Sequence, residues 1–163
     1  MNFPLEEQLV NKLIEKNWHI SCAESCTGGL VASRIVNVAN ASRVFDASFV
    51  TYANEAKIKY LGVFPETIEK HGVVSEEVVF EMAEGVAKET GAKVGIAVSG
   101  IAGPSGGTDK KPVGMVCFGF YVNGKITTYT CQFGNPGRNK VRALSTEFAL
   151  KSALDLISNQ ETN

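Results

Sequence analysis

The segment Ala-Glu-Ser-Cys-Thr-Gly-Gly at residues 23–29 is the first candidate for chemistry. It places the hydroxyls of Ser25 and Thr27 before Gly28 and Gly29, and a helical pattern of apolar residues begins directly afterwards. Backbone N–H groups at the start of a helix can bind a phosphate or a developing oxyanion, and the glutamate of the segment is a candidate base. Spacing alone favours an ordinary helix cap, with two glycines that permit close packing. The segment is neither a Walker A motif nor a G-x-G-x-x-G motif.

A second candidate is the glycine-rich segment at residues 99–107, which begins with Ser99 and Gly100 and contains four glycines and one proline. Several free backbone amides in such a loop can form an anion-binding nest. Because the loop follows a buried strand, it lies where α/β proteins commonly bind ligands. A flexible connection that happens to be rich in glycine explains the same pattern equally well.

The third candidate combines Ser42, Tyr52 and Lys57. A lysine in a pocket can have its pKa lowered enough to accept a proton from a serine hydroxyl, and a tyrosine can stack on a planar ligand. On sequence alone, Lys57 is more typical of a solvated helical lysine. Arg138 and Arg142 lie one helical turn apart and could bind a phosphate, although they could equally be ordinary surface arginines.

Composition narrows the classes of protein. The 163 residues include 16 basic and 17 acidic residues, a balance that gives no general attraction to nucleic acid or anionic lipid. The most apolar segment, Val113–Val122, is half the length of a membrane-spanning helix, and the N-terminus lacks the pattern of a secretory leader. Four cysteines in a chain of this size predict cytosolic thiols. Two histidines without metal-ligand spacing predict no metal or other cofactor.

The pattern of apolar residues predicts the elements that must position these groups. Helical spacing predicts helices over 4–16, 30–38, 54–60, 65–71 and 76–89, with a long C-terminal helix that includes 141–157. Strands are predicted over 18–22, 45–52, 93–98, 114–122 and 125–133. Asn123-Gly124 between the last two predicts a β-hairpin. We therefore expect a single domain over 1–163, with a three-layer α/β/α architecture and a mixed sheet.

Two classes of function fit these residues. One is an enzyme that acts on a small phosphorylated substrate through a serine nucleophile, and the other is a nucleotide- or protein-binding module without chemistry. The hydroxyl- and glycine-rich turns, together with the tyrosine–lysine pair, fit the enzyme slightly better.

Several motifs in the same order give the sequence a resemblance to the CinA C-terminal-domain family, the nicotinamide mononucleotide amidases of bacterial pyridine-nucleotide salvage. These motifs are AESCTGG, FVTYANEAK, GVVSEEVVFEMA, SGIAGPSGG and KPVGMVCFGF. The resemblance implies metal-independent hydrolysis of the carboxamide of nicotinamide mononucleotide, with release of ammonia. It also implies a homo-oligomer. The cysteine usage and the composition, taken separately, predict a cytoplasmic protein that binds neither membrane nor nucleic acid directly.

Carried over by motif, the resemblance implies that Ser25, Thr27, Ser42, Tyr52, Lys57, Ser99 and Arg138 form the site. Many members have threonine at the Ser99 position, and the acidic residue that often precedes the late arginine is absent here. Our hypothesis from sequence is that Ser42 attacks the carboxamide with Lys57 as its base, while Ser25 is the rival nucleophile. The turn that contains Gly28 and Gly29 would hold the oxyanion. Tyr52 would position the pyridine ring, and the Ser99–Gly100 loop with Arg138 would hold the phosphate.

Two other functions remain open from the sequence. The first is a non-catalytic nucleotide- or protein-binding role in competence or DNA damage, consistent with the naming of the family. The second is hydrolysis of another phosphorylated amide.

Overall fold

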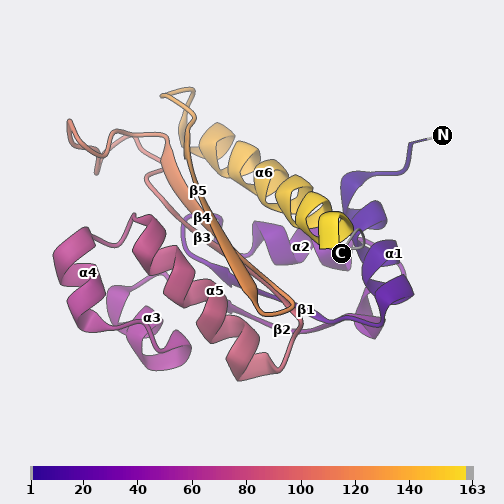
Figure 1. Ribbon diagram of the computed structural model, residues 1–163. Helices are drawn as coiled ribbons and strands as arrows, with labels where there is room; N and C mark the ends of the chain where they lie inside the picture. Colours follow the sequence, from indigo (N-terminus) through magenta and orange to yellow (C-terminus); the bar gives the residue numbers. More distant parts are fainter. Residues whose placement is uncertain (1, 161–163) are drawn as a thin grey trace.

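The computed structural model describes residues 2–160. Its centre is a five-stranded mixed sheet in the order β2-β1-β3-β4-β5 (Figure 1). The strands are β1 (Ile20–Glu24), β2 (Phe45–Val50), β3 (Val94–Gly100), β4 (Met115–Val122) and β5 (Lys125–Gln132). β1 pairs in parallel with β2 and β3, whereas β4 runs antiparallel to both β3 and β5. The expected mixed sheet with an antiparallel hairpin is confirmed.

Helices cover both faces of the sheet, as Figure 1 shows. On one face lie α1 (Leu5–Lys16), α2 (Leu30–Val36) and the long α6 (Arg138–Asn159). On the other lie α3 (Asn54–Leu61), α4 (Pro65–His71) and α5 (Glu76–Thr90). A short 3₁₀ helix, η1 (Ala41–Arg43), precedes β2. The three-layer α/β/α architecture is therefore confirmed.

Local sequence explains most element boundaries. Ser75 caps α5, since its hydroxyl accepts a hydrogen bond from the Val78 amide at 3.2 Å. Asn123 and Gly124 both have positive φ, which is the geometry of a two-residue hairpin turn. The first strand begins two residues later than expected, because the Trp18 amide still donates to the Leu13 carbonyl at the end of α1.

Two layers of apolar side chains flank the sheet. The larger layer, between the sheet and α1, α2 and α6, includes Leu13, Ile96, Phe118 and Leu150. The layer beneath α5 uses smaller residues on the sheet, so this helix approaches closely. A Cβ added to Gly119 of β4 would lie 2.2 Å from the Val79 carbonyl oxygen of α5. Glycine at position 119 is therefore what allows α5 to lie this close to the sheet.

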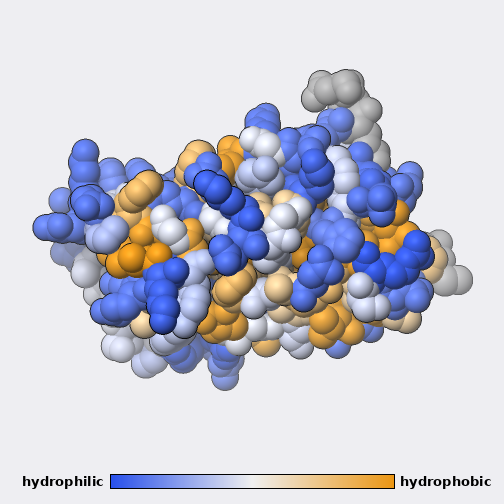
Figure 2. Space-filling model, turned by 90° about the horizontal axis from the view of Figure 1, so that it is seen from below, coloured by the Kyte–Doolittle hydropathy of each residue, from blue (hydrophilic) through white to orange (hydrophobic). Residues whose placement is uncertain are grey.

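The surface seen from the side of α3–α5 is largely hydrophilic, with separate hydrophobic patches (Figure 2). Exposed aromatic side chains in this part of the chain include Tyr60, Phe64 and Phe80. Within residues 2–160, no helix is both long and apolar enough to cross a membrane. The four cysteines are free thiols, three of them buried.

Candidate active site

The candidate site lies where three neighbouring strands end. The register places Glu24 of β1 level with Val50 of β2 and Val98 of β3. Ser25, Thr51 and Ser99 follow these three residues, so they emerge side by side at one edge of the sheet. This edge is the carboxyl end of the parallel strands, where α/β proteins commonly bind ligands.

Lys57 of α3 brings an amine to this edge. Its side chain is 0% exposed, and its Nζ lies 3.2 Å from Ser25 Oγ, 2.6 Å from the Thr51 carbonyl oxygen and 3.4 Å from that of Tyr52. Desolvation lowers the pKa of Lys57 from 10.5 to about 8. The ion pairs found within residues 2–160 include none to Lys57 that would restore the charged form.

The three acceptors around Lys57 fit both protonation states of the amine. A protonated lysine has three N–H donors, one for each oxygen. The neutral amine has two N–H bonds, which can remain on the Thr51 and Tyr52 carbonyls, and one lone pair, which can accept the hydroxyl proton of Ser25. The geometry therefore suits proton transfer from Ser25 to Lys57.

Ser42 does not belong to this cluster, which corrects the Ser42–Lys57 pair expected from the sequence. It is exposed in η1, and the neighbouring Val44 carbonyl accepts the amide of Ile20 at the start of β1. Lys57, in contrast, binds the residues that follow the end of β2. Because β2 is six residues long, about 20 Å separates its two ends.

The turn after β1 is held by internal hydrogen bonds. The buried Glu24 carboxylate accepts the amides of Gly29 at 3.2 Å, Val31 at 2.9 Å and Ala32 at 3.0 Å, so it caps α2. The Gly28 amide donates to the Ser25 carbonyl at 3.0 Å. Glu24, Gly28 and Gly29 thus have structural partners, and Glu24 is a helix cap where the sequence allowed a base.

Two amides of this turn remain available. Among the hydrogen bonds within residues 2–160, none to another residue uses the N–H of Cys26 or of Thr27 as a donor. The buried hydroxyl of Thr27 likewise has no hydrogen-bond partner in this part of the chain.

The glycine-rich loop contributes differently from what its sequence suggested. The buried Ser99 hydroxyl donates to the Val73 carbonyl at 2.9 Å. A Cβ at Gly100 would lie 2.6 Å from Val116 Cγ2, so this glycine makes room for β4. Both residues still line the cavity described below, but each already has a structural role.

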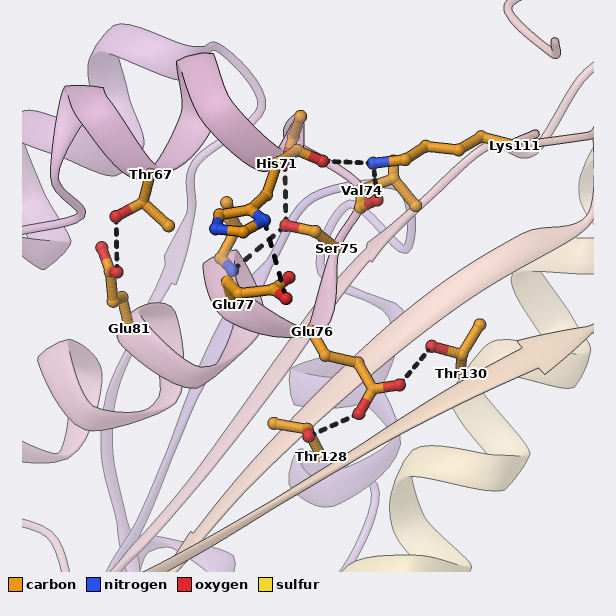
Figure 3. Close-up of polar contacts among 12 residues, drawn as sticks. Thr67, His71, Val74, Ser75, Glu76, Glu77, Glu81, Lys111, Thr128 and Thr130 are labelled. Carbon is orange, nitrogen blue, oxygen red and sulfur yellow. Dashed lines mark hydrogen bonds and ion pairs between the residues drawn. The ribbon is translucent and has the colours of Figure 1, made fainter.

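A wall of the site is formed by residues 71–74, whose four carbonyl oxygens all accept hydrogen bonds from side chains. Lys111 Nζ donates to the carbonyls of His71 and, at 2.6 Å, Val74. Ser75 binds the Gly72 carbonyl at 2.8 Å, and Ser99 binds that of Val73. Figure 3 shows the Lys111 side chain pointing toward His71 and Val74, with Ser75 beside the segment. The wall is therefore anchored to two other parts of the chain.

Arg138, at the start of α6, joins the remaining parts of the site. Its Nη2 lies 3.0 Å from the Tyr52 hydroxyl, and its Nη1 lies 2.7 Å from the Gly103 carbonyl oxygen. Tyr52 is 62% exposed. The guanidinium thus lies between the end of β2 and the glycine-rich loop.

These groups surround an open cavity of about 340 Å³. Six of the residues expected from the sequence line it: Ser25, Tyr52, Lys57, Ser99, Gly100 and Arg138. Thr27, Gly28, Gly29 and Ser42 do not. The sequence did not indicate the apolar lining of Cys26, Val73 and Val74. Of these, Cys26 directly follows Ser25, and adjacency to the candidate nucleophile could have signalled it.

Known proteins share both this sequence and this fold. Residues 2–157 match the family described as the CinA C-terminal domain. The chain belongs to that family. A CinA-like protein of Kosmotoga olearia is 55% identical over 146 residues, which is 90% of this chain and 35% of that protein. A protein of Enterobacter agglomerans named nicotinamide-nucleotide amidohydrolase PncC is 51% identical over 140 residues, 85% of each chain.

Solved structures of CinA-superfamily proteins have the same fold. One from Klebsiella pneumoniae is 35% identical with a TM-score of 0.91, and the match covers 95% of this chain and 96% of that one. The resemblance found in the sequence motifs is thus confirmed. Some curated CinA relatives are longer proteins: this chain spans 35% of the Kosmotoga relative, and 37% of a putative competence-damage inducible protein of Alkaliphilus oremlandii.

Proposed function

We propose that the chain hydrolyses the carboxamide of nicotinamide mononucleotide, with Ser25 as nucleophile and Lys57 as general base. The observation that carries this proposal is the 3.2 Å contact between the buried Lys57 amine and Ser25 Oγ in a cavity. Support for the substrate comes from the printed name of the Enterobacter agglomerans relative, which matches 85% of each chain.

The first half of the reaction forms an acyl-enzyme. The neutral Lys57 amine accepts the Ser25 hydroxyl proton while Oγ attacks the carboxamide carbon, giving a tetrahedral oxyanion. The free amides of Cys26 and Thr27, which directly follow the nucleophile, are the donors for this oxyanion. The intermediate then collapses, the C–N bond breaks, and the Lys57 ammonium returns its proton to the leaving nitrogen. Ammonia leaves, and an ester links the nicotinoyl group to Ser25.

The second half restores the enzyme. Lys57, neutral again, accepts a proton from a water molecule that attacks the ester carbon. The second tetrahedral intermediate breaks the bond to Ser25 Oγ, which takes the proton back from Lys57. The sum is one amide and one water converted to one carboxylic acid and one ammonia, with neither redox change nor added co-reactant.

Binding groups lie around the reacting pair. Arg138 uses one N–H on Gly103 and another on Tyr52, which leaves further donors of its five for a phosphate. Val73 and Val74 give an apolar surface for the pyridine ring. In this proposal the mononucleotide spans the cavity from Ser25 to Arg138.

The deciding experiment is ammonia release from nicotinamide mononucleotide by the purified protein, with EDTA present and free nicotinamide as the control. We expect release that is selective for the mononucleotide and resistant to EDTA. Ammonia release from a panel of other phosphorylated amides tests whether the protein selects substrates with a pyridine ring. Ligand binding without ammonia release would replace the proposal by the non-catalytic binding role.

A further inference from the structure

Arg142 of α6 does not line the cavity, yet it binds the turn that follows Ser25. Its Nε lies 2.9 Å from the Cys26 carbonyl oxygen, and its Nη2 lies 3.3 Å from that of Thr27. Its Nη1 lies 3.2 Å from Asn139 Oδ1, which fixes the guanidinium on α6 itself. One side chain thus binds the carbonyls of the two residues after the proposed nucleophile.

Peptide geometry links these carbonyls to the amides on the opposite side. A trans peptide is planar, so its C=O and N–H point in opposite directions. The Thr27 carbonyl accepts hydrogen bonds from the Leu30 amide at 3.0 Å and from Arg142 at 3.3 Å, and the N–H of the same peptide, that of Gly28, donates to the Ser25 carbonyl. The side of the turn opposite Arg142 is therefore the side of the Ser25 backbone carbonyl.

The same reasoning applies to the preceding peptide. The Cys26 carbonyl faces Arg142, so the Thr27 N–H of that peptide points away from α6. This N–H has no acceptor within residues 2–160. A rotation of the Cys26–Thr27 peptide would therefore break the hydrogen bond from Arg142 and, at the same time, change the direction of the Thr27 N–H.

Gly28 leaves the space that the guanidinium occupies. Its φ is +57°, and a Cβ added to it would lie 3.3 Å from Arg142 Nη2. The tight turn and the arginine therefore fit one another.

We propose that Arg142 is a positioning residue that orients the Thr27 amide toward the oxyanion formed on Ser25. This inference rests on the proposed amidase function. Arg142 contacts no reacting atom, and its effect passes through the peptide between Cys26 and Thr27. Loss of the guanidinium should therefore weaken stabilisation of the transition state while substrate binding at Arg138 and the wall is unchanged.

The test compares an amide with a thioamide. Sulfur accepts hydrogen bonds more weakly than oxygen, so thionicotinamide mononucleotide gains less from the oriented amide than the oxygen substrate does. Ammonia release from both substrates is measured for wild type, Arg142→Met and Arg142→Lys, with thermal unfolding to check the fold. Arg43→Met, which removes an exposed arginine at the opposite end of β2, is the matched control.

For Arg142→Met we expect a 10- to 100-fold lower kcat on the amide and a KM within about threefold of wild type, part of the loss seen when an oxyanion donor is removed outright. The amide-to-thioamide ratio of kcat should fall about tenfold. Arg142→Lys should be intermediate, because an ammonium can bind one of the two carbonyls. Arg43→Met should match wild type in all these quantities.

Other results would overturn the inference. Equal losses on both substrates, or a change in KM alone, would show that Arg142 does not act on the oxyanion. Unfolding of both Arg142 variants would make it a structural residue only. No ammonia from wild type would refute the proposed function itself, whereas an active wild type with an unchanged ratio in Arg142→Met would refute the inference alone.

Discussion

The Arg138 guanidinium lies 3.0 Å from the Tyr52 hydroxyl, although 86 positions separate the two residues in the chain. This contact joins the start of α6 to the end of β2 beside the candidate cavity. It keeps a positive charge at the cavity that Ser25 and Lys57 also line, where a nucleotide phosphate would lie in the proposed complex.

Arg138→Ala should therefore weaken substrate binding. A hydrogen bond to a charged group contributes about 1.5–3 kcal/mol, so we expect KM to rise about 10- to 100-fold. The kcat should stay within a few-fold, because the reacting pair is untouched. Steady-state kinetics measure both values, and Lys140→Ala, which removes an exposed charge two residues away, is the control. An unchanged KM would place the phosphate elsewhere.

Substitution of the two candidate serines should have opposite outcomes. Ser25→Ala removes the hydroxyl beside Lys57 and should lower kcat by at least about a thousandfold. Ser42→Ala changes an exposed side chain at the other end of β2 and should leave kcat within about twofold. Ammonia release by both variants is the measurement. Activity in Ser25→Ala, with loss in Ser42→Ala, would reverse the assignment.

The activity should rise with pH through the pKa of Lys57. That pKa is about 8, so about a tenth of the amine is neutral at pH 7 and the fraction increases as pH rises. The value of kcat/KM should therefore increase, reach about half of its maximum near pH 8 and become constant about one pH unit higher. Measurement of kcat/KM between pH 6 and 10 tests this in wild type. A rate that decreases across pH 7–9 would exclude Lys57 as the base.

Lys57→Met should abolish activity and yet stabilise the fold. The pKa of Lys57 is lower in the folded chain than its ordinary 10.5, so folding carries the full cost of burying the ammonium below pH 8. This cost decreases between pH 8 and 10.5. The shift sets an upper limit of about 3 kcal/mol, and we expect a gain of about 1–2 kcal/mol at pH 7 because the Thr51 carbonyl loses its donor.

Thermal and denaturant unfolding at pH 7 and pH 10 measure this gain. For a domain of this size, each kcal/mol raises Tm by about 2–4 °C. The difference between wild type and Lys57→Met should be smaller at pH 10, where the wild-type amine is neutral. A lower Tm for Lys57→Met at pH 7 would contradict the expectation.

The sequence predicted the elements well because their signals are local. Asn123-Gly124 specifies its hairpin by positive φ, and Ser75 specifies the start of α5 by its cap. Ser25 and Lys57 meet because β1 and β2 pair in a register that brings the residues after Glu24 and Val50 side by side, where the Lys57 amine binds both. Strand register is not visible in the sequence, so the sequence indicated both residues but paired Lys57 with Ser42. Ser42 and Lys57 are close in sequence, but β2 lies between them and carries them to opposite edges.

Other parts of the site depend on contacts across the fold. From the sequence, Ser99 is a candidate ligand-binding hydroxyl, but in the fold it donates to the Val73 carbonyl. Arg142 could be an ordinary surface arginine from the sequence, but α6 lies over the turn after β1 and brings it to the Cys26 carbonyl. Glu24 is a candidate base from the sequence, but its carboxylate accepts hydrogen bonds from the first amides of α2. The partners of Ser99 and Arg142 are fixed by tertiary packing, which periodicity and motif spacing do not describe. The partners of Glu24 lie only five to eight residues further along the chain, but the shape of the turn that brings them to its carboxylate is not specified by spacing either.

Gly119 does not line the candidate cavity, yet the close approach of α5 to this residue affects the shape of the cavity. The wall at residues 71–74 leads directly into α5, and Ser75 joins the two by capping the helix and binding the Gly72 carbonyl. A methyl group at position 119 would meet the Val79 carbonyl and push the helix outward, and Val73 and Val74 with it. In the proposed complex, the space beside Val73 and Val74 thus depends on the absence of a side chain in the middle of β4, at a position that touches no substrate atom.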